Sequence, residues 1–212
     1  MIFVVDGSHD GDENMRRDIA LLEDAEQGYA GGRIYYWNSV WVTLGRFQTP
    51  EETLLQEINY TVRPTGGAAV LHGHDLTIGL AVPLEQINCT PREVKTIYRI
   101  MVTPIVNAFN AIKISATLGE DAGEDEIRSS TFCFSQKSRN DVLSLKTGNK
   151  ICGVAMRVTN KAALIQASIP VSTPLVDPET VIKDAQKMPW IPFEPRHFET
   201  AFSEEMLNLD WE

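Results

Sequence analysis

The chain has 212 residues, the length of one domain or of one domain with a small appendage. Hydrophobic residues make up 43% and charged residues 23%, a globular composition that excludes wholesale disorder and fibrous repeats. The formal net charge of −10 argues against broad nucleic-acid binding, which requires a basic face. Three cysteines without CxxC spacing and only four histidines argue against a disulfide framework and against a metal site.

The N-terminal residues carry no pattern typical of export. The apolar run at residues 1–5 is too short for a signal peptide, and acidic residues follow it. No stretch of 18 apolar residues occurs in the sequence, so no membrane span is expected. We therefore expect a cytoplasmic protein.

The first part of the chain predicts both strands and a helix. Residues 2–5 have the apolar character of a short buried strand, and residues 13–26 carry apolar side chains at helical spacing. Residues 33–37 and 40–44 are aromatic and β-branched. The short polar link between them predicts a β-hairpin.

Two segments share one helix-start pattern. Thr49-Pro50 and Thr90-Pro91 each place a capping threonine before a proline, and a glutamate follows that can complete a capping box. The second start predicts a helix over residues 91–110, because an apolar stripe continues along it. Between the two helices, residues 76–82 predict a strand.

The later part of the chain predicts more strands than helices. Residues 119–128 are rich in acids and glycine, which is typical of a solvated loop. The further elements expected are strands at 131–134, 141–145, 150–158 and 162–169 and helices at 177–187 and 199–207. Mixed order and short connections favour an α+β fold with a mixed, largely antiparallel sheet.

Residues 63–72, RPTGGAAVLH, form a candidate anion-binding loop. Gly66 and Gly67 permit positive φ and a close approach of the backbone to a ligand. Arg63 adds a donor fork for a phosphate or a carboxylate. The segment lacks the GK[ST] of a Walker A loop and the GxGxxG of a dinucleotide site. An ordinary Gly-Gly turn accounts for the same residues.

Lys150 and Cys133 are the candidate reactive side chains. Lys150 stands between a turn and an apolar strand, where it can clamp a phosphate or a carbonyl oxygen or simply guard a strand edge. Cys133 lies between two phenylalanines, so it is either a buried inert thiol or a nucleophile activated by a basic neighbour. The residue pattern alone leaves both alternatives open.

Several blocks together resemble the superfamily of lipoate–protein ligase A and the octanoyltransferases, which is related to biotin protein ligase. The matching blocks, in family order, are Asn14-Met15 with Asp18 and Leu21-Leu22, Tyr36-Trp37, Leu44-Gly45-Arg46-Phe47-Gln48, the loop from Arg63 to His72, Asn140-Asp141-Val142 and Gly148 to Ala155. They run from about residue 12 to residue 169. The occurrence of these blocks in family order makes the resemblance specific.

The resemblance implies a central mixed or antiparallel sheet flanked by helices, with a small second sheet, in a single catalytic domain of residues 1–212 without a C-terminal accessory domain. It implies transfer of a lipoyl or octanoyl group to a lysine of a lipoyl domain or of the glycine-cleavage H protein. Lys150 and Cys133 take the catalytic roles. The substrate-binding residues that it implies are Arg63, Thr65, Gly66, Gly67, Ala68, Val70, His72, Gly153 and Ala155. Leu71, Ile78 and Trp37 are further lining candidates.

Two mechanisms fit the resemblance. A transferase would take the acyl chain from acyl carrier protein onto a cysteine; Cys133-Phe134 resembles the "CF" of one octanoyltransferase group. A ligase would use ATP, magnesium and free lipoate and would not need the cysteine.

The chain also departs from the family pattern. A third hypothesis, besides the transferase and the ligase, is therefore a non-catalytic homologue that binds an acyl group. The third glycine of the loop is Ala68, the usual "GSA" is Gly153-Val154-Ala155, and Gln166-Ala167-Ser168 stands where the family has "HG[ST]".

Overall fold

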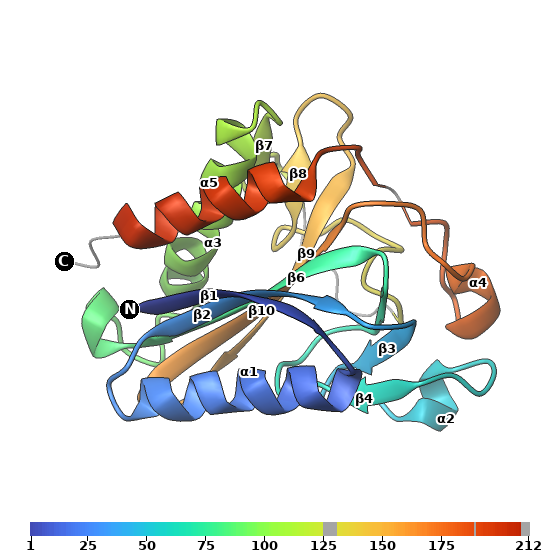
Figure 1. The fold of residues 1–212 in the computed structure, drawn as a ribbon, viewed down its shortest axis with the longest axis horizontal. Helices are drawn as coiled ribbons and strands as arrows, with labels where there is room; N and C mark the ends of the chain where they lie inside the picture. The colour runs from blue at the N-terminus through green and yellow to red at the C-terminus, as the bar shows by residue number, and fades with distance from the viewer. Residues whose placement is uncertain (125–130, 189, 209–212) are drawn as a thin grey trace.

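A computed structural model describes residues 1–124, 131–188 and 190–208. It has the predicted α+β architecture: a large mixed sheet, a small second sheet and flanking helices (Figure 1). The large sheet consists of β1 (Ile2–His9), β2 (Gly31–Trp37), β6 (Asp75–Pro83), β7 (Ala116–Leu118), β8 (Val142–Ser144), β9 (Lys150–Val158) and β10 (Ala162–Pro170). Its strand order is β1-β2-β6-β10-β9-β8-β7. Only the β1–β2 pair of this sheet is parallel.

The small sheet has the order β4-β3-β5, with β3 (Trp41–Leu44) between β4 (Tyr60–Val62) and β5 (Val70–His72). The predicted hairpin of residues 33–37 and 40–44 is therefore wrong. Both segments are strands, but β2 pairs with β1 and β6, whereas β3 pairs with β4 and β5. The polar link between them carries the chain from one sheet to the other.

The helices cover both faces of the large sheet (Figure 1). One face carries α1 (Gly11–Glu26), and the opposite face carries α3 (Val94–Ala111) and α5 (Pro195–Asn208). Phe109 of α3 packs on Phe198 of α5 with ring centroids 4.7 Å apart. The central strands β6 and β10 are buried along their whole length, as expected for strands covered on both faces.

Polar side chains hold α1 to the sheet. Asp18 is completely buried and pairs with Arg33 of β2 at 2.8 Å. Gly79 of β6 makes this approach possible, because a Cβ there would lie 2.5 Å from the Asp18 carboxylate. The helix is thus held by this ion pair as well as by apolar contacts of Leu22 and Ala25 with β6 and β10.

Three predicted helices differ from the structure in extent. The segment after Thr49 forms only the turn α2 (Pro50–Thr53), and that after Asp177 forms only α4 (Pro178–Val181). Both stop because the next residues, Leu54 and Ile182, are extended and pair with each other across an isolated bridge. The helix expected at 91–110 begins at Val94, because Glu93 bonds the backbone and hydroxyl of the preceding threonine.

The remaining predictions concern short segments. The strand expected at 131–134 is reduced to one bridge, between Phe132 and Ala69. The expected helix at 199–207 lies within the longer α5, and the turn η1 spans Glu85–Ile87. Residues 125–128 of the predicted acidic loop lie outside the described part of the chain. Within the described ranges, no helix is long and apolar enough to cross a bilayer.

Candidate functional site

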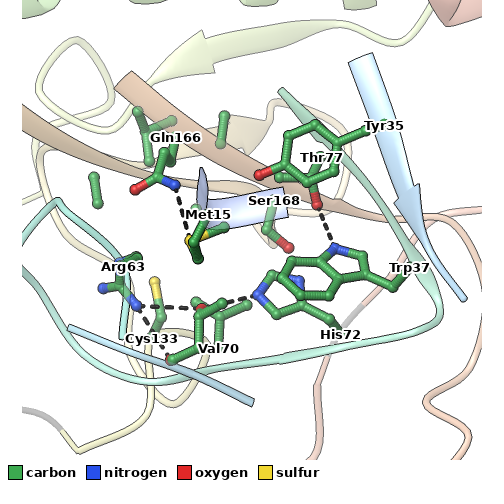
Figure 2. Close-up of a pocket in the computed structure, with 15 residues that line it drawn as sticks. Met15, Tyr35, Trp37, Arg63, Val70, His72, Thr77, Cys133, Gln166 and Ser168 are labelled. Carbon is green, nitrogen blue, oxygen red and sulfur yellow. Dashed lines mark hydrogen bonds between the residues drawn. The ribbon is translucent and has the colours of Figure 1, made fainter. Parts of the chain in front are cut away.

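A pocket lies where the two sheets meet (Figure 2). Its walls come from α1, from strands of both sheets and from the segment around Cys133. The lining residues are Met15, Tyr35, Trp37, Thr43, Arg63, Val70, His72, Thr77, Cys133, Gly153, Val154, Ala155, Gln166, Ala167 and Ser168. The expected lining residues Val70 and Trp37 are among them, whereas Leu71 and Ile78 are not.

One end of the pocket is closed by a buried polar cluster around His72. Trp37 stacks on the imidazole with ring centroids 3.9 Å apart. His72 bonds Asp75 through Nδ1 at 2.7 Å and Thr43 through Nε2 at 2.9 Å. Ser168 donates its hydroxyl to the same Asp75 oxygen at 2.6 Å. These polar atoms bond one another and not the interior of the pocket. The pocket wall at this end is therefore mostly apolar.

Asp75 is the charged centre of that cluster. Burial would raise the pKa of its carboxyl, but the charge of His72 and the hydrogen bonds from His72 and Ser168 lower it to about 2. The carboxylate therefore stays ionised and fixes the orientation of the imidazole at the pocket wall.

Arg63 lies at the other side of the pocket, near Cys133 (Figure 2). Its five N–H groups are all used within the chain: one on Thr65, two on the oxygens of Thr43, and two on the carbonyls of Gly66 and Ala68. Burial lowers the pKa of this guanidinium to about 10. Arg63 thus holds the Gly-Gly loop in shape and contributes positive charge to the pocket without a free donor.

A second network ties this loop to α1. Thr65 donates to Gln166 of β10 at 2.7 Å, and Gln166 donates to Asp18 at 2.6 Å. Tyr35 of β2 also donates to Asp18, at 2.7 Å. Burial raises the pKa of Asp18, against the opposing effects of Arg33 and these hydrogen bonds. The loop, the large sheet and the helix are therefore linked by one buried chain of polar contacts.

Cys133 and Lys150 meet at the pocket. Backbone bonds in both directions join the Cys133 segment to Ala69, next to β5 of the small sheet. Lys150 is the first residue of β9 in the large sheet. Its ammonium lies 3.2 Å from the Cys133 sulfur, 2.5 Å from the Cys133 carbonyl and 2.7 Å from Asp141. The structure therefore brings together a thiol from a segment bonded to Ala69 beside the small sheet and an ammonium from the first residue of a strand of the large sheet.

Lys150 is a buried cation, only 3% exposed. Burial alone would lower the pKa of its ammonium, but the charges and hydrogen bonds of Cys133 and Asp141 raise it above its ordinary value. Gly153 leaves the space that this arrangement needs, because a Cβ there would lie 3.0 Å from the Cys133 sulfur and 3.2 Å from Lys150 Cε. The pair is fixed in place by its surroundings.

The Gly-Gly loop separates the pocket from an outer groove. Gly67 has φ +89° and packs against Gly45, where a Cβ would lie 1.9 Å from the Gly67 carbonyl oxygen. The groove has a volume of about 1010 Å³. Its lining residues are Gly66, Gly67, Val94, Lys95, Tyr98, Arg139, Asn140, Val154, Ala155 and Met156. Val154 and Ala155 line both hollows, so groove and pocket adjoin.

The predicted site residues lie in one region. Arg63, Val70, His72, Cys133, Gly153 and Ala155 line the pocket, Gly66, Gly67 and Ala155 line the groove, Thr65 and Ala68 bond Arg63, and Lys150 contacts Cys133. Their roles toward a substrate stay predictions.

Sequence reasoning assigned no role to four polar residues of the site: Asp75, Asp141, Gln166 and Ser168. Two of them had a visible signal, since Gln166 and Ser168 interrupt an otherwise apolar strand at a spacing of two. Asp141 stands in a motif block that matched, yet nothing in the sequence shows that its carboxylate meets Lys150. Among the described residues, no group of three His, Cys, Asp or Glu side chains is placed to hold a metal ion.

The fold and the site define a catalytic domain of the lipoate-ligase type. A crystal structure of lipoate-protein ligase A bound with ATP superposes with a TM-score of 0.75 and 18% identity, covering 97% of this chain and 85% of that chain. A structure of a bi-partite lipoate protein ligase and its E2 lipoyl domain from Thermoplasma acidophilum gives a TM-score of 0.65 and 18% identity, over 96% of this chain and 81% of that chain.

Residues 10–191 match the model of the lipoyl protein ligase A/B catalytic domain, and the chain belongs to this family. Among similar proteins, the octanoyltransferase LipM of Halalkalibacterium halodurans is 28% identical over 177 residues, which cover 77% of this chain and 63% of the relative. LipM of Geobacillus kaustophilus is 30% identical over 166 residues, covering 72% and 58%. The chain thus matches less than two thirds of the length of these relatives.

Proposed function

We propose that this chain transfers an octanoyl or lipoyl group to a lysine of a lipoyl carrier domain through an acyl thioester on Cys133. The observation that carries the proposal is the Cys133 sulfur on the wall of an apolar pocket with the Lys150 ammonium 3.2 Å away. A sulfur nucleophile needs a nearby cation to stabilise its thiolate. Lys150 supplies positive charge there, and so does Arg63, whose hydrogen bonds go to hydroxyl and carbonyl oxygens and not to a carboxylate.

In the first step the Cys133 thiolate attacks the carbonyl carbon of an acyl thioester donor. A C–S bond forms to Cys133, the bond to the donor sulfur breaks, and the donor leaves as a thiolate that takes a proton. Lys150 stabilises the negative charge that develops on the carbonyl oxygen. The pocket walls exclude water from the acyl chain.

In the second step the amine of the acceptor lysine attacks the Cys133 thioester. A C–N bond forms, the C–S bond breaks, and the Cys133 thiolate leaves while the amine gives up a proton. Acyl carrier protein is the proposed donor, and a lipoyl domain or the glycine-cleavage H protein is the proposed acceptor, in the cytoplasm. The neighbour with an E2 lipoyl domain supports a lipoyl domain as the acceptor, and the octanoyltransferase LipM relatives support an octanoyl group as the transferred chain. Acyl carrier protein and the H protein are proposed from the sequence resemblance alone.

A second candidate is an ATP-dependent lipoate ligase. It is favoured by the outer groove of about 1010 Å³, which adjoins the pocket and carries Lys95 and Arg139. Lys95 offers a contact for a nucleotide phosphate there, whereas Arg139 already pairs with Glu120. In that case ATP and magnesium would be required, and Cys133 would take no part.

The test is the intact mass of an apo lipoyl domain after incubation with this protein. One reaction contains octanoyl-acyl carrier protein without ATP, and the other contains lipoate with ATP and magnesium. We expect acylation in the first reaction and its loss in Cys133→Ser. Acylation only in the second reaction, unchanged in Cys133→Ser, would replace the transferase by the ligase. No acylation in either reaction would leave a non-catalytic acyl-binding homologue.

A further inference from the structure

Lys150 presents a chemical hazard if Cys133 carries an acyl group. Its nitrogen lies 3.2 Å from the sulfur, so the carbonyl carbon bonded to that sulfur in a thioester would lie close to this nitrogen. A free amine at that place would attack the thioester carbonyl carbon. A C–N bond to Lys150 would form, the C–S bond would break, and the thiolate would leave with the proton from nitrogen. The product, an amide on Lys150, would end catalysis in that molecule.

Resting on the proposed thioester function, we propose that Asp141 is a positioning residue that keeps Lys150 protonated, so that the acyl group passes to the acceptor and not to Lys150. The carboxylate lies 2.7 Å from the ammonium and is itself buried. An ammonium has no lone pair and cannot attack a carbonyl carbon. It can still stabilise the oxyanion of either transfer step.

The geometry gives this role to Asp141 in particular. Its second oxygen accepts the backbone N–H of Ser138 at 2.7 Å and the Ser138 hydroxyl at 3.0 Å. The carboxylate is thereby fixed in orientation with one oxygen directed at Lys150. Within the described residues, Asp141 makes the only ion pair of Lys150 with a carboxylate.

The other titratable groups near this site cannot replace Asp141 as the counter-charge of the Lys150 ammonium. Cys152 of β9 is buried, and burial raises the pKa of its thiol well above its ordinary value, so this thiol is neutral. Tyr98 of α3 is partly buried and donates its hydroxyl to the carbonyl of Asn140, and desolvation likewise raises the pKa of its phenol. The Phe134 ring, 4.8 Å from the ammonium, adds only a weak attraction. Arg63 near Cys133 is itself a cation, so it cannot act as a counter-charge for the Lys150 ammonium.

Acylation of Cys133 increases the dependence of the Lys150 ammonium on Asp141. In the free enzyme, both Cys133 and Asp141 stabilise the Lys150 ammonium. A Cys133 thioester carries no charge, so the contribution of Cys133 to holding the proton on Lys150 is lost at the moment when a free amine becomes harmful. Among the described residues, Asp141 is then the remaining ion-pair partner of Lys150, and the backbone carbonyl of Cys133 is the remaining acceptor.

The test follows the chemical stability of the bound octanoyl group, because hydroxylamine cleaves thioesters but not amides. Wild type and Asp141→Asn are incubated with octanoyl-acyl carrier protein alone, treated with hydroxylamine and weighed intact. Wild type should lose its octanoyl group. Asp141→Asn should accumulate a resistant octanoyl group about tenfold faster than wild type, mapped by peptide mass to Lys150 and absent from Asp141→Asn with Lys150→Arg.

Two further measurements separate this role from a structural one. In wild type the resistant adduct should increase with rising pH as Lys150 loses its proton, and Asp141→Asn should shift this increase to lower pH. Ser138→Ala removes a contact of Asp141 but leaves the carboxylate on Lys150, so its octanoyl group should stay labile to hydroxylamine.

The outcomes distinguish the two proposals. A labile octanoyl group in Asp141→Asn, at every pH, would overturn the role of Asp141 and leave the thioester function intact. No octanoyl group on wild-type Cys133 would overturn the proposed function itself. A resistant group in wild type at neutral pH would show that Lys150 is not protected.

Discussion

At the scale of single residues, the site depends on glycines that leave room for other backbone. Gly45 lies so close to the Gly-Gly loop that a Cβ would be 1.9 Å from the carbonyl oxygen of Gly67. The loop backbone cannot easily move away from Gly45, because Arg63 donates a hydrogen bond to the carbonyl of Gly66, next to Gly67. This contact places the loop relative to the small sheet.

We therefore predict that Gly45→Ala displaces the loop. Overpacking of this kind costs about 1–3 kcal/mol of stability, measurable by urea unfolding, and a displaced loop should slow acylation of Cys133 about tenfold or more. Gly66→Ala is the matched control, because its added Cβ meets only Phe47, at 4.0 Å. Equal losses in both variants would contradict this explanation.

At the scale of elements, the docking of α1 depends on one close contact with β6. Gly79→Ala would press a methyl group against the buried Asp18 carboxylate, at 2.5 Å. We predict a loss of about 1–3 kcal/mol in unfolding free energy and faster hydrogen exchange in α1. Gly31→Ala is the control, since it meets the same helix only through the flexible tip of Leu21, at 3.0 Å, and should change exchange little.

The sequence predicts elements where a pattern is local. The strands β9 and β10 were predicted almost to their ends, because each is a continuous apolar run between turns. Prediction from sequence fails where strand pairing depends on residues far apart in the chain. The segments of β2 and β3 have the pattern of a hairpin, but they join different sheets. The short turns α2 and α4 carry good helix starts, yet the Leu54–Ile182 bridge ends both.

The site could be predicted only as far as its motifs reach. The Gly-Gly loop, Cys133 and Lys150 were all chosen from sequence blocks. The partners that orient them were not, because His72–Asp75 and Lys150–Asp141 are contacts between side chains whose directions depend on the folded strands.

At the scale of the whole molecule, the buried charges couple stability to pH. The pKa of Asp75 is about 2 in the folded chain, against about 3.9 for an unfolded aspartate. Its contribution of about 2 kcal/mol is complete above about pH 5 and is lost as pH falls toward 2. In Asp75→Asn this dependence should be absent, so the difference in unfolding free energy from wild type should shrink between pH 5 and pH 2. A constant difference would show that folding does not lower the pKa of Asp75.

The reactive pair spans the seam between the two sheets, with the sulfur attached through Ala69 to the small sheet and the ammonium at the start of β9 in the large one. Local opening of such a seam requires less free energy than global unfolding. When the seam opens, the thiol leaves its cation although every strand is still paired within its own sheet. We therefore expect that a loss of the proposed activity precedes global unfolding and is reversible in molecules that have not unfolded.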